Sequence, residues 1–413
     1  MYIDRIRIRG FRTFRDTGAD FVHPDRAFDA AGMPRPRLAN VNLLLGNNGL
    51  GKTTLLKAIA LAALGPAVGD SGIFPYRLVR KGPEPEDAEN ADRATIEATF
   101  TPHPQDDLGG LAHIESAVAV LRRGDLESLR WTHPNDKPWH PIFSAESDAF
   151  FFVGYGATRR VERRDQLDLG ARRGSAFVRA QRVQSLFEDA YSLVPLNAWL
   201  PDFEHRNPGR YKQVVNLVNR LLGPDRYRFH GKLGDGEYLF EHDGLEVPFP
   251  ALSDGYRAFL GWVGDLLYHV CMTCPSGRKL VDNHGIVMVD EIDLHLHPQW
   301  QMQVLPTIAK ALPRIQFIVT SHSPLIVGSL EWMNLLVMAP GPHQSSLVVR
   351  RPQRIHGLDA DQLLLTDLFG LRSTRAPAKE DRLKALTLKA REGDDQAALE
   401  LLKEMSTGSE APE

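Results

Sequence analysis

The most specific chemistry in the chain is predicted for eight residues, GNNGLGKT, from Gly46 to Thr53. They match the pattern G-x-x-x-x-G-K-[ST] and lie between an apolar run at 41–45 and a segment with apolar residues at helical spacing. Glycines permit a tight loop whose backbone N–H groups surround a phosphate, and the amino end of a helix adds partial positive charge. We therefore predict a phosphate-binding loop formed by Gly46, Asn47, Asn48, Gly49, Gly51, Lys52, Thr53 and Thr54.

Two side chains at the end of this motif have separate predicted roles. The Lys52 ammonium would contact the β and γ oxygens of ATP, and the Thr53 hydroxyl would ligate Mg²⁺. An ordinary Asn/Gly turn before a helix is the alternative interpretation, and the placement between a strand and a helix argues against it. The motif thus predicts ATP and Mg²⁺ as cofactors.

A second apolar run, GIVMVDEID, ends in paired carboxylates. Its four apolar residues predict a buried strand that presents Asp290 and Glu291 at the carboxyl edge of a sheet, where ligands bind in open α/β folds. Asp290 would bind the Mg²⁺, and Glu291 would polarise the attacking water as general base. The alternative is a plain strand end followed by acidic capping residues.

Two further segments carry candidate residues for phosphate chemistry. In IVTSHSP an apolar strand ends near His322, which is predicted to hydrogen-bond the γ-phosphate and the attacking water; a satisfied structural histidine is the alternative. In LSDGYR, Ser253 and the Gly255 backbone lie at a helix start and predict a second anion site. Ser253 or Asp254 could instead serve only as a helix cap.

Alternating strands and helices must position these residues. The strand, helix, strand rhythm of 285–321 is typical of a parallel sheet, and short antiparallel strands are expected between about 93 and 133. Helices are expected over 183–194 and 211–223, the second ended by Gly223 and Pro224. Two charged helices are expected after Ile355, and no internal repeat or sustained heptad pattern is present.

Composition sets limits on the class of protein. The chain has 413 residues, of which 43% are hydrophobic and 24% charged, and its net charge is -3. These values are typical of a globular protein and argue against a globally basic nucleic-acid binder. The alternating start MYIDRIRIRGF is not a signal peptide, no membrane span is predicted, and two cysteines exclude a disulfide framework. We expect a cytoplasmic protein.

The order of the motifs resembles the ABC-type ATPase head of the SMC, RecF and OLD-like group within the AAA ATPases. The resemblance implies an α/β P-loop ABC-ATPase head with a mixed central sheet, a β-rich arm and a helical lid. In that family the signature, here Ser253 to Gly255, closes over the γ-phosphate bound to a second subunit, so the resemblance implies a homodimer or a higher oligomer. It divides the chain into an N-terminal core half with the arm (1–155), a helical lid (156–249), a C-terminal core half (250–355) and C-terminal helices (356–413).

The chain departs from the family pattern at several positions. Asp254 stands where the family signature usually has Gly or Ser, and Tyr256 stands where it has Gln or Glu. No glutamine occupies the expected Q-loop region, so Tyr155 or Arg159 is the candidate replacement. Asp293 matches the acidic residue of the family loop that runs along the dimer seam.

A narrower resemblance concerns three segments, VGYGATRR, RVQSLFEDAYSLVPLNAWL and DADQLLLTDLFGLRSTR. They look similar to compact ATPases of bacterial antiphage systems such as Septu and related retrons, which implies control of a separate effector protein such as a nuclease. The alternative is a RecF-like ATP-dependent clamp on duplex DNA. A transporter subunit is a third class, disfavoured by the absent glutamine and the atypical signature.

Three other clusters have competing interpretations. His295 and His297 invite a metal site but would point apart on a helix start. Cys271 and Cys274, with His269 and His284, could bind zinc, although buried thiols are the simpler interpretation. Between Arg159 and Arg182, eight arginines face three acids, which is typical either of a nucleic-acid contact or of a solvated helix face.

Overall fold

The computed structural model forms two compact units, Met1–Gly357 and Leu358–Glu413. It describes residues 1–81, 92–106, 108–143, 150–161, 178–223, 227–353, 355–371, 373–374 and 377–406.

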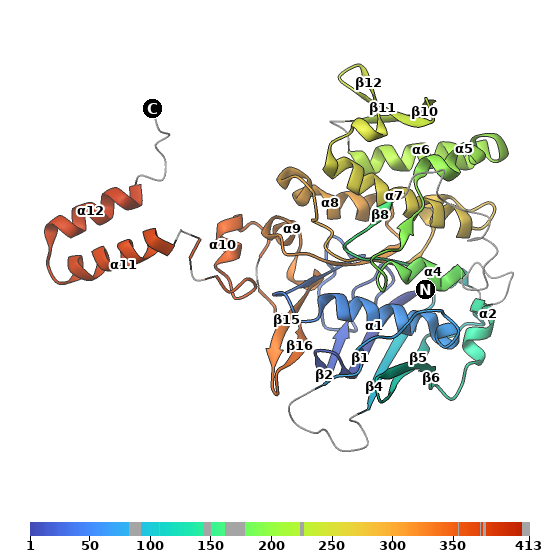
Figure 1. The fold of residues 1–413 in the computed structure, drawn as a ribbon, viewed down its shortest axis with the longest axis horizontal. Helices are drawn as coiled ribbons and strands as arrows, with labels where there is room; N and C mark the ends of the chain where they lie inside the picture. Colours follow the sequence, from blue (N-terminus) through green and yellow to red (C-terminus); the bar gives the residue numbers. More distant parts are fainter. Residues whose placement is uncertain are drawn as a thin grey trace. The chain divides into compact units, whose positions relative to one another are not determined.

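A mixed sheet lies at the centre of the first unit, as the fold prediction required (Figure 1). Among the described residues it has six strands in the order β16-β15-β3-β14-β13-β7, of which β15 and β16 are antiparallel and the other pairs are parallel. Four neighbouring strands of this sheet, β3, β14, β13 and β7, are buried along their whole length, because a parallel sheet is covered on both faces. The strands are β3 (Val41–Leu45), β7 (Phe151–Tyr155), β13 (Gly285–Val289), β14 (Ile315–Thr320), β15 (Leu335–Gly341) and β16 (Ser345–Val349).

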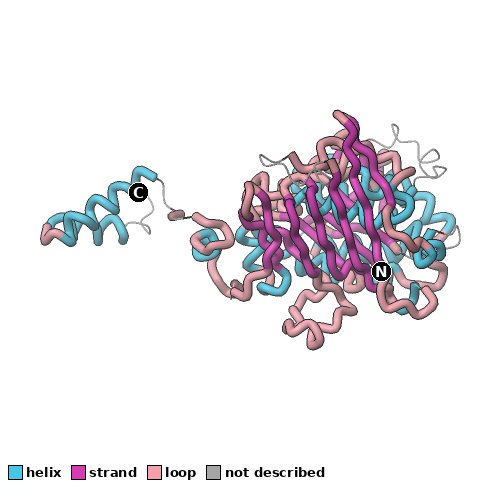
Figure 2. Tube along the Cα trace, turned by 90° about the horizontal axis from the view of Figure 1, so that it is seen from below, coloured by secondary structure: helices cyan, strands magenta, loops and turns pink. Residues whose placement is uncertain are grey.

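A second, antiparallel sheet contains the strands expected between 93 and 133 together with the N-terminal strands. Its order is β2-β1-β4-β5-β6 in the described part of the chain, and its strands lie side by side in the view from below (Figure 2). The strands of the 93–133 segment therefore share one sheet with the N-terminal strands β1 and β2. The strands are β1 (Tyr2–Phe11), β2 (Phe14–Asp20), β4 (Arg93–Thr101), β5 (Ile114–Arg123) and β6 (Leu126–Trp131).

Helix α1 (Lys52–Leu64) packs between these two sheets. It contacts β4 and β5 on one side and β7 and β14 on the other, and the Ser116 hydroxyl donates to the Ala62 carbonyl over 2.7 Å. Contact on both sides explains why most of its residues are apolar and eleven of the thirteen are buried. The helix that follows the predicted phosphate loop is therefore fixed in the core of the unit.

Helices and two small sheets, β10-β11-β12 and β8-β9, make up the described part of residues 160–273. Helix α6 begins after Asn207, whose side chain accepts from the Arg210 backbone, and ends at Gly223 with φ of 80°. The elements are β8 (Arg160–Val161), α4 (Val178–Gln184), β9 (Ser192–Leu193), α5 (Leu196–Arg206), α6 (Pro208–Leu222), β10 (Arg228–Gly234), β11 (Glu237–His242), β12 (Leu245–Pro248) and α7 (Asp254–Thr273).

The prediction of a helix over 183–194 is wrong. Helix α4 ends at Gln184, and the chain continues through turns closed by bonds from the Phe187 and Glu188 N–H groups to the Gln184 carbonyl. The apolar spacing that suggested a helix has another cause, because Val183 and Leu186 are buried in the core without belonging to one helical stripe. In the described part of this unit, the other α-helices are α2 (His140–Phe143), α8 (Pro298–Ala311) and α9 (Pro324–Gly328).

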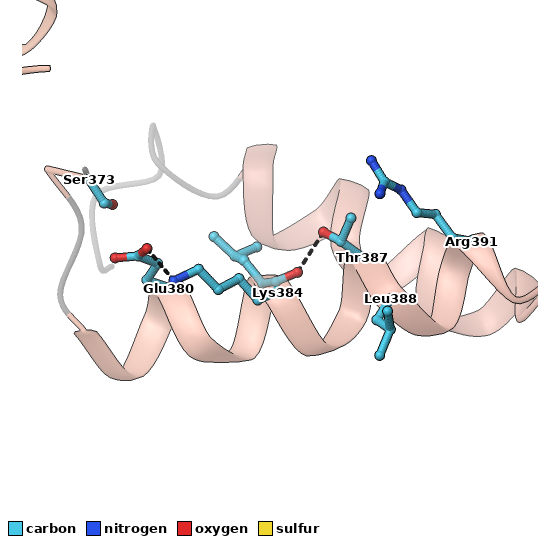
Figure 3. A pocket seen from close by; sticks show the side chains of 7 residues that line it. Ser373, Glu380, Lys384, Thr387, Leu388 and Arg391 are labelled. Carbon is cyan, nitrogen blue, oxygen red and sulfur yellow. Dashed lines mark hydrogen bonds and ion pairs between the residues drawn. The ribbon is translucent and has the colours of Figure 1, made fainter. Parts of the chain in front are cut away.

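The second unit contains α10 (Ala360–Leu364), α11 (Pro377–Arg391) and α12 (Asp395–Ser406). Arg382 of α11 forms ion pairs with Glu400 and Glu404 of α12, at 2.7 and 2.8 Å. A hollow of about 280 Å³ lies along α11, where Lys384 pairs with Glu380 over 2.5 Å (Figure 3). No residue predicted to bind nucleotide lines this hollow.

A buried polar cluster lies before the amino ends of β13 and β14. The His284 Nε2 atom is 2.5 Å from Asp106, which also pairs with the Met1 amine at 2.9 Å. The ring of His103 stacks on that of His284 with centroids 3.9 Å apart. Burial and the neighbouring His284 lower the pKa of His103 to about 4, from the ordinary value of 6.5.

We expect this cluster to make stability fall in mild acid. Because the pKa of His103 is lower in the folded state, the unfolded chain binds the extra proton first as the pH falls below 6.5. The free energy of unfolding should therefore drop by roughly 1–3 kcal/mol between pH 7 and pH 4 on account of this group. Urea titrations across that range measure the slope. His103→Gln should flatten it, and an unchanged slope in this variant would contradict the assignment.

Candidate nucleotide-binding site

Four parallel strands end at one edge of the mixed sheet and position the candidate residues there. In the register of this sheet, Leu44 of β3 pairs with Thr320 of β14. Val289 of β13 pairs with Val319 of β14 on one side and with Tyr155 of β7 on the other. The segments that follow β3, β14, β13 and β7 therefore emerge side by side. They carry the phosphate-loop motif, His322, the Asp-Glu pair and Arg159 respectively.

The loop at 46–53 has the backbone conformation that its glycines permit. Gly46, Gly49 and Gly51 have φ of 150°, 83° and 98°, a region that side chains with a Cβ rarely adopt. A Cβ at Gly51 would lie 2.4 Å from the Thr13 hydroxyl oxygen, so glycine is also required there by the close packing of β2 and its turn. The loop therefore fits a phosphate that approaches backbone N–H groups.

Lys52 is buried and folds back over the loop. Its Nζ donates to the Gly46 carbonyl over 2.7 Å and to the Asn47 carbonyl over 3.4 Å. Burial lowers the pKa of Lys52, and the charges of Asp290 and Glu291 partly oppose that shift. The ammonium group is thus located within the loop, as its predicted role requires.

Asp290 lies between two threonine hydroxyls. Thr53 Oγ1 donates to Asp290 Oδ2 and Thr320 Oγ1 donates to Asp290 Oδ1, each over 2.6 Å. Hydroxyl and carboxylate oxygens are ligands that Mg²⁺ prefers, so the donor set formed by Thr53 and Asp290 fits this ion. Thr320 was missed by the sequence analysis, although its place as the last residue of an apolar strand was a usable signal.

Glu291 has an unusual backbone conformation. Its φ is 47°, its N–H donates to Thr320 Oγ1 over 2.7 Å, and its carbonyl accepts from Arg159 Nη2 over 2.8 Å. No hydrogen bond to its carboxylate occurs among the residues that the structure describes. The main chain of Glu291 is therefore anchored at both ends of the residue while its carboxylate is left to interact with a ligand or water.

His322 is exposed and follows Ser321, which is fully buried. Partial burial and the nearby charge of Lys52 lower the pKa of His322, which favours the neutral ring. A neutral imidazole can both donate and accept a hydrogen bond. This form suits the predicted contact with a phosphate oxygen and a water molecule.

The predicted signature lies at the start of α7. Ser253 occupies the N-cap position but makes no capping hydrogen bond through its side chain, and Asp254 forms an ion pair with Arg257. Ser253 therefore holds the N-cap position without a capping bond from its side chain, Asp254 is the first residue of the helix, and both are exposed. Gly255 packs against the loop after Glu291, because a Cβ there would lie 2.7 Å from the His295 carbonyl oxygen.

A cavity of about 450 Å³ opens beside the signature. The Trp300 indole N–H donates to the Tyr256 hydroxyl over 3.1 Å, so Tyr256 packs against α8 and does not face the solvent as a polar group. In the described part of the chain, no hydrogen bond or ion pair joins Ser253 or Gly255 to the loop at 46–53. The cavity is lined by Ser253, Gly255, Tyr256, His295, Leu296, His297 and Trp300.

The two candidate replacements for the missing glutamine behave differently. The Tyr155 hydroxyl donates to Asp265 Oδ2 of α7 over 2.8 Å and is buried, so its candidacy is contradicted. Arg159, in contrast, contacts the Glu291 carbonyl. Asp293 lies two residues after Glu291, and its Oδ1 atom is buried without a partner among the described residues.

The metal and zinc alternatives receive no support. No group of three or more His, Cys, Asp or Glu side chains suited to a metal ion occurs within the described ranges. His297 Nδ1 instead accepts from the Gln299 N–H over 3.4 Å. Cys271 and Cys274 are buried free thiols, and burial raises the pKa of Cys271 to about 12.

The arginine-rich stretch is described only in part, since residues 162–177 lie outside the described residues. Arg179 donates to the Ile142 carbonyl and lies 4.6 Å from the ring centroid of Phe143. Burial lowers the pKa of Arg182 to about 10. Arg179 therefore packs against the 142–143 segment, whereas Arg182 is half-buried and its Nε atom has no hydrogen-bond partner among the described residues.

Taken over the described residues, no helix has both the length and the apolar character that a membrane span requires.

A phosphate loop beside a strand that ends in Asp-Glu, on the carboxyl edge of a mixed sheet, defines the ABC-type class of P-loop ATPase domain. Residues 41–328 match the sequence model of the family described as "AAA domain, putative AbiEii toxin, Type IV TA system", and the chain belongs to this family.

Curated relatives come from two kinds of system. The Septu protein PtuA of Bacillus mycoides (strain KBAB4) is 24% identical over 382 residues, which cover 92% of this chain and 46% of that protein. The Retron Ec83 probable ATPase of Escherichia coli is 38% identical over 105 residues, which cover 25% of this chain and 19% of that protein. The chain therefore spans less than half the length of these two relatives.

Among solved structures, the Smc head bound to the C-terminal winged-helix domain of ScpA has a TM-score of 0.51 and 16% identity. The likeness covers 84% of this chain and 97% of that chain. It confirms the SMC-like head fold that the order of motifs implied.

Proposed function

We propose that the protein binds ATP with Mg²⁺ and hydrolyses it to ADP and phosphate. The observation that carries this proposal is the group formed by Thr53, Asp290 and Thr320, joined by two 2.6 Å hydrogen bonds directly beside Glu291. Lys52 and the loop N–H groups would bind the β and γ oxygens, and Mg²⁺ bound by Thr53 and Asp290 would neutralise their charge.

Glu291 would act as the general base in this reaction. Its carboxylate accepts a proton from water as the water oxygen bonds to the γ-phosphorus, and the bond from that phosphorus to the ADP oxygen breaks. The neutral ring of His322 would contact the γ-phosphate and the attacking water. The proton released from water and the phosphate then leave the site as products.

We further propose that two copies of the chain close around ATP. The exposed, uncapped Ser253 hydroxyl and the absence of described contacts to the 46–53 loop support a phosphate ligand that is bound to another copy. Backbone N–H groups at the start of the 20-residue helix α7 would add partial positive charge toward this anion.

Control of a separate effector protein, such as a nuclease in antiphage defence, is the biological role that we propose for a cytoplasmic ATPase of this kind. The similarity to a Septu protein PtuA and to a retron probable ATPase supports this role. The alternative of a RecF-like DNA clamp receives no support from Arg179, which donates to the Ile142 carbonyl. Purification of the native complex, followed by mass spectrometry of bound proteins, tests the effector.

A mixing experiment tests the shared site. Lys52→Ala and Ser253→Arg should each be inactive alone, because one lacks the phosphate lysine and the other blocks the signature. In an equimolar mixture, half of the dimers carry one intact site, so about a quarter of the wild-type ATPase activity should return. Phosphate release measures this recovery.

The control for this experiment is Ser276→Arg, an exposed serine that lies outside the signature. That variant should keep wild-type activity by itself. If the mixture of Lys52→Ala and Ser253→Arg stays inactive while the control remains active, each chain does not complete the site of the other, and the dimer proposal is wrong.

A further inference from the structure

Arg159 makes a direct contact with the main chain of the proposed general base. Its Nη2 atom donates to the Glu291 carbonyl over 2.8 Å, across 132 residues of sequence. Arg159 is half-buried, and its buried Nη1 atom has no hydrogen-bond partner within the described residues. A buried guanidinium nitrogen without a partner is unusual, because desolvating a charged group without full pairing is costly.

Both residues in this contact have left-handed backbones. Arg159 has φ of 36° and Glu291 has φ of 47°, a conformation that residues with a Cβ adopt only when their surroundings impose it. The Glu291 N–H donates to Thr320 Oγ1, and the Glu291 carbonyl accepts from Arg159 and, over 3.1 Å, from the Leu294 N–H. Arg159 is the side chain among these partners that reaches the Glu291 carbonyl from another strand end, and together these bonds hold the main chain from which the Glu291 side chain leaves.

The segment that carries Arg159 is fixed at its base. The Gly156 N–H donates to Ser185 Oγ over 3.1 Å, and a Cβ at Gly156 would lie 2.2 Å from the Ser185 carbonyl oxygen. One residue earlier, the Tyr155 hydroxyl donates to Asp265, a buried residue of the helix that begins with the signature. The segment 155–159 thus contacts the signature helix through Tyr155 and the Glu291 main chain through Arg159.

We propose that Arg159 is a positioning residue that keeps the Glu291 backbone in the conformation required for water activation. This inference rests on the proposed ATPase function, and it gives Arg159 the place of the Q-loop glutamine that the sequence lacks. The chemistry differs from that of an amide, because a guanidinium only donates hydrogen bonds and cannot ligate Mg²⁺. Arg159 therefore acts through the Glu291 carbonyl and not through the metal.

A purely structural role of Arg159 would change the kinetic constants differently from a positioning role. If Arg159 only stabilised the fold, its loss would lower thermal stability and reduce ATP binding and turnover together. If Arg159 positions Glu291, its loss lowers kcat while the KM for ATP and the affinity for a nucleotide stay unchanged, because the phosphate-binding residues remain in place.

The test compares Arg159→Ala, Arg159→Lys and Arg159→Gln in the full chain. We expect kcat to fall about 10–100-fold in the alanine and glutamine variants with KM within about twofold of wild type. Lysine should recover part of the loss, because its ammonium can donate to the carbonyl. Added guanidinium ion should rescue Arg159→Ala, whereas methylammonium should rescue it less.

Arg160→Ala, which changes the exposed neighbouring arginine, is the matched control and should retain wild-type kcat. A wild-type kcat in Arg159→Ala would overturn this inference and leave the ATPase proposal standing. Equal losses of nucleotide binding and turnover in a folded Arg159→Lys would also overturn it. Absence of ATP hydrolysis by the wild-type protein would instead overturn the proposed function itself.

Discussion

Glu291→Gln should reduce ATP hydrolysis about 10²–10⁴-fold and leave ATP binding intact, since the amide lacks the basic oxygen of the carboxylate while the phosphate ligands remain. Because the products do not form, the variant should also accumulate as a nucleotide-bound dimer. Phosphate release measures the first effect. Light scattering with and without ATP measures the second, through a doubling of the molar mass.

The outcomes for Glu291→Gln test two claims separately, the role of Glu291 as the base and the closure of a dimer around ATP. A variant that binds ATP but remains a monomer would count against the closed dimer and leave the role of the base intact. Near-normal hydrolysis would remove Glu291 from the chemistry. Glu246→Gln, which changes a solvent-accessible glutamate of β12, is a suitable control and should alter neither reading.

Lys52→Ala should weaken ATP binding about 10–100-fold, because a charge-assisted contact to the phosphate oxygens is lost. Lys52 is buried in the loop and bonded to the Gly46 carbonyl, so circular dichroism is needed to show that the variant is folded. Fluorescence titration with a labelled ATP analogue measures the affinity. Lys310→Ala, an exposed lysine of α8, is the control. Unchanged binding by Lys52→Ala would remove the phosphate-loop assignment.

The central part of the site was predictable because its determinants are local in sequence. A strand, a glycine loop and a helix follow one another within 41–64, and Asp290 and Glu291 directly follow the apolar strand β13. Parallel register then brings such strand ends to one edge, which is a property of the fold class and needs no knowledge of individual contacts.

Other parts of the site were not predictable for the opposite reason. The bond from Arg159 to Glu291 joins residues far apart in sequence, and nothing in the local pattern distinguished Arg159 from Tyr155, which turns into the core to bind Asp265. The segment 183–194 shows a related failure, because spacing of apolar residues reports burial and does not specify the backbone conformation that achieves it.

The contact between Gly255 and the His295 carbonyl has a consequence for how a pair of such subunits would separate. With no room for even a methyl group between them, a shift of the turn bearing Ser253 toward this loop would press directly on the segment that follows Asp293. Release of ADP would then require both segments to move away together, so the two subunits would separate over the whole interface in one step.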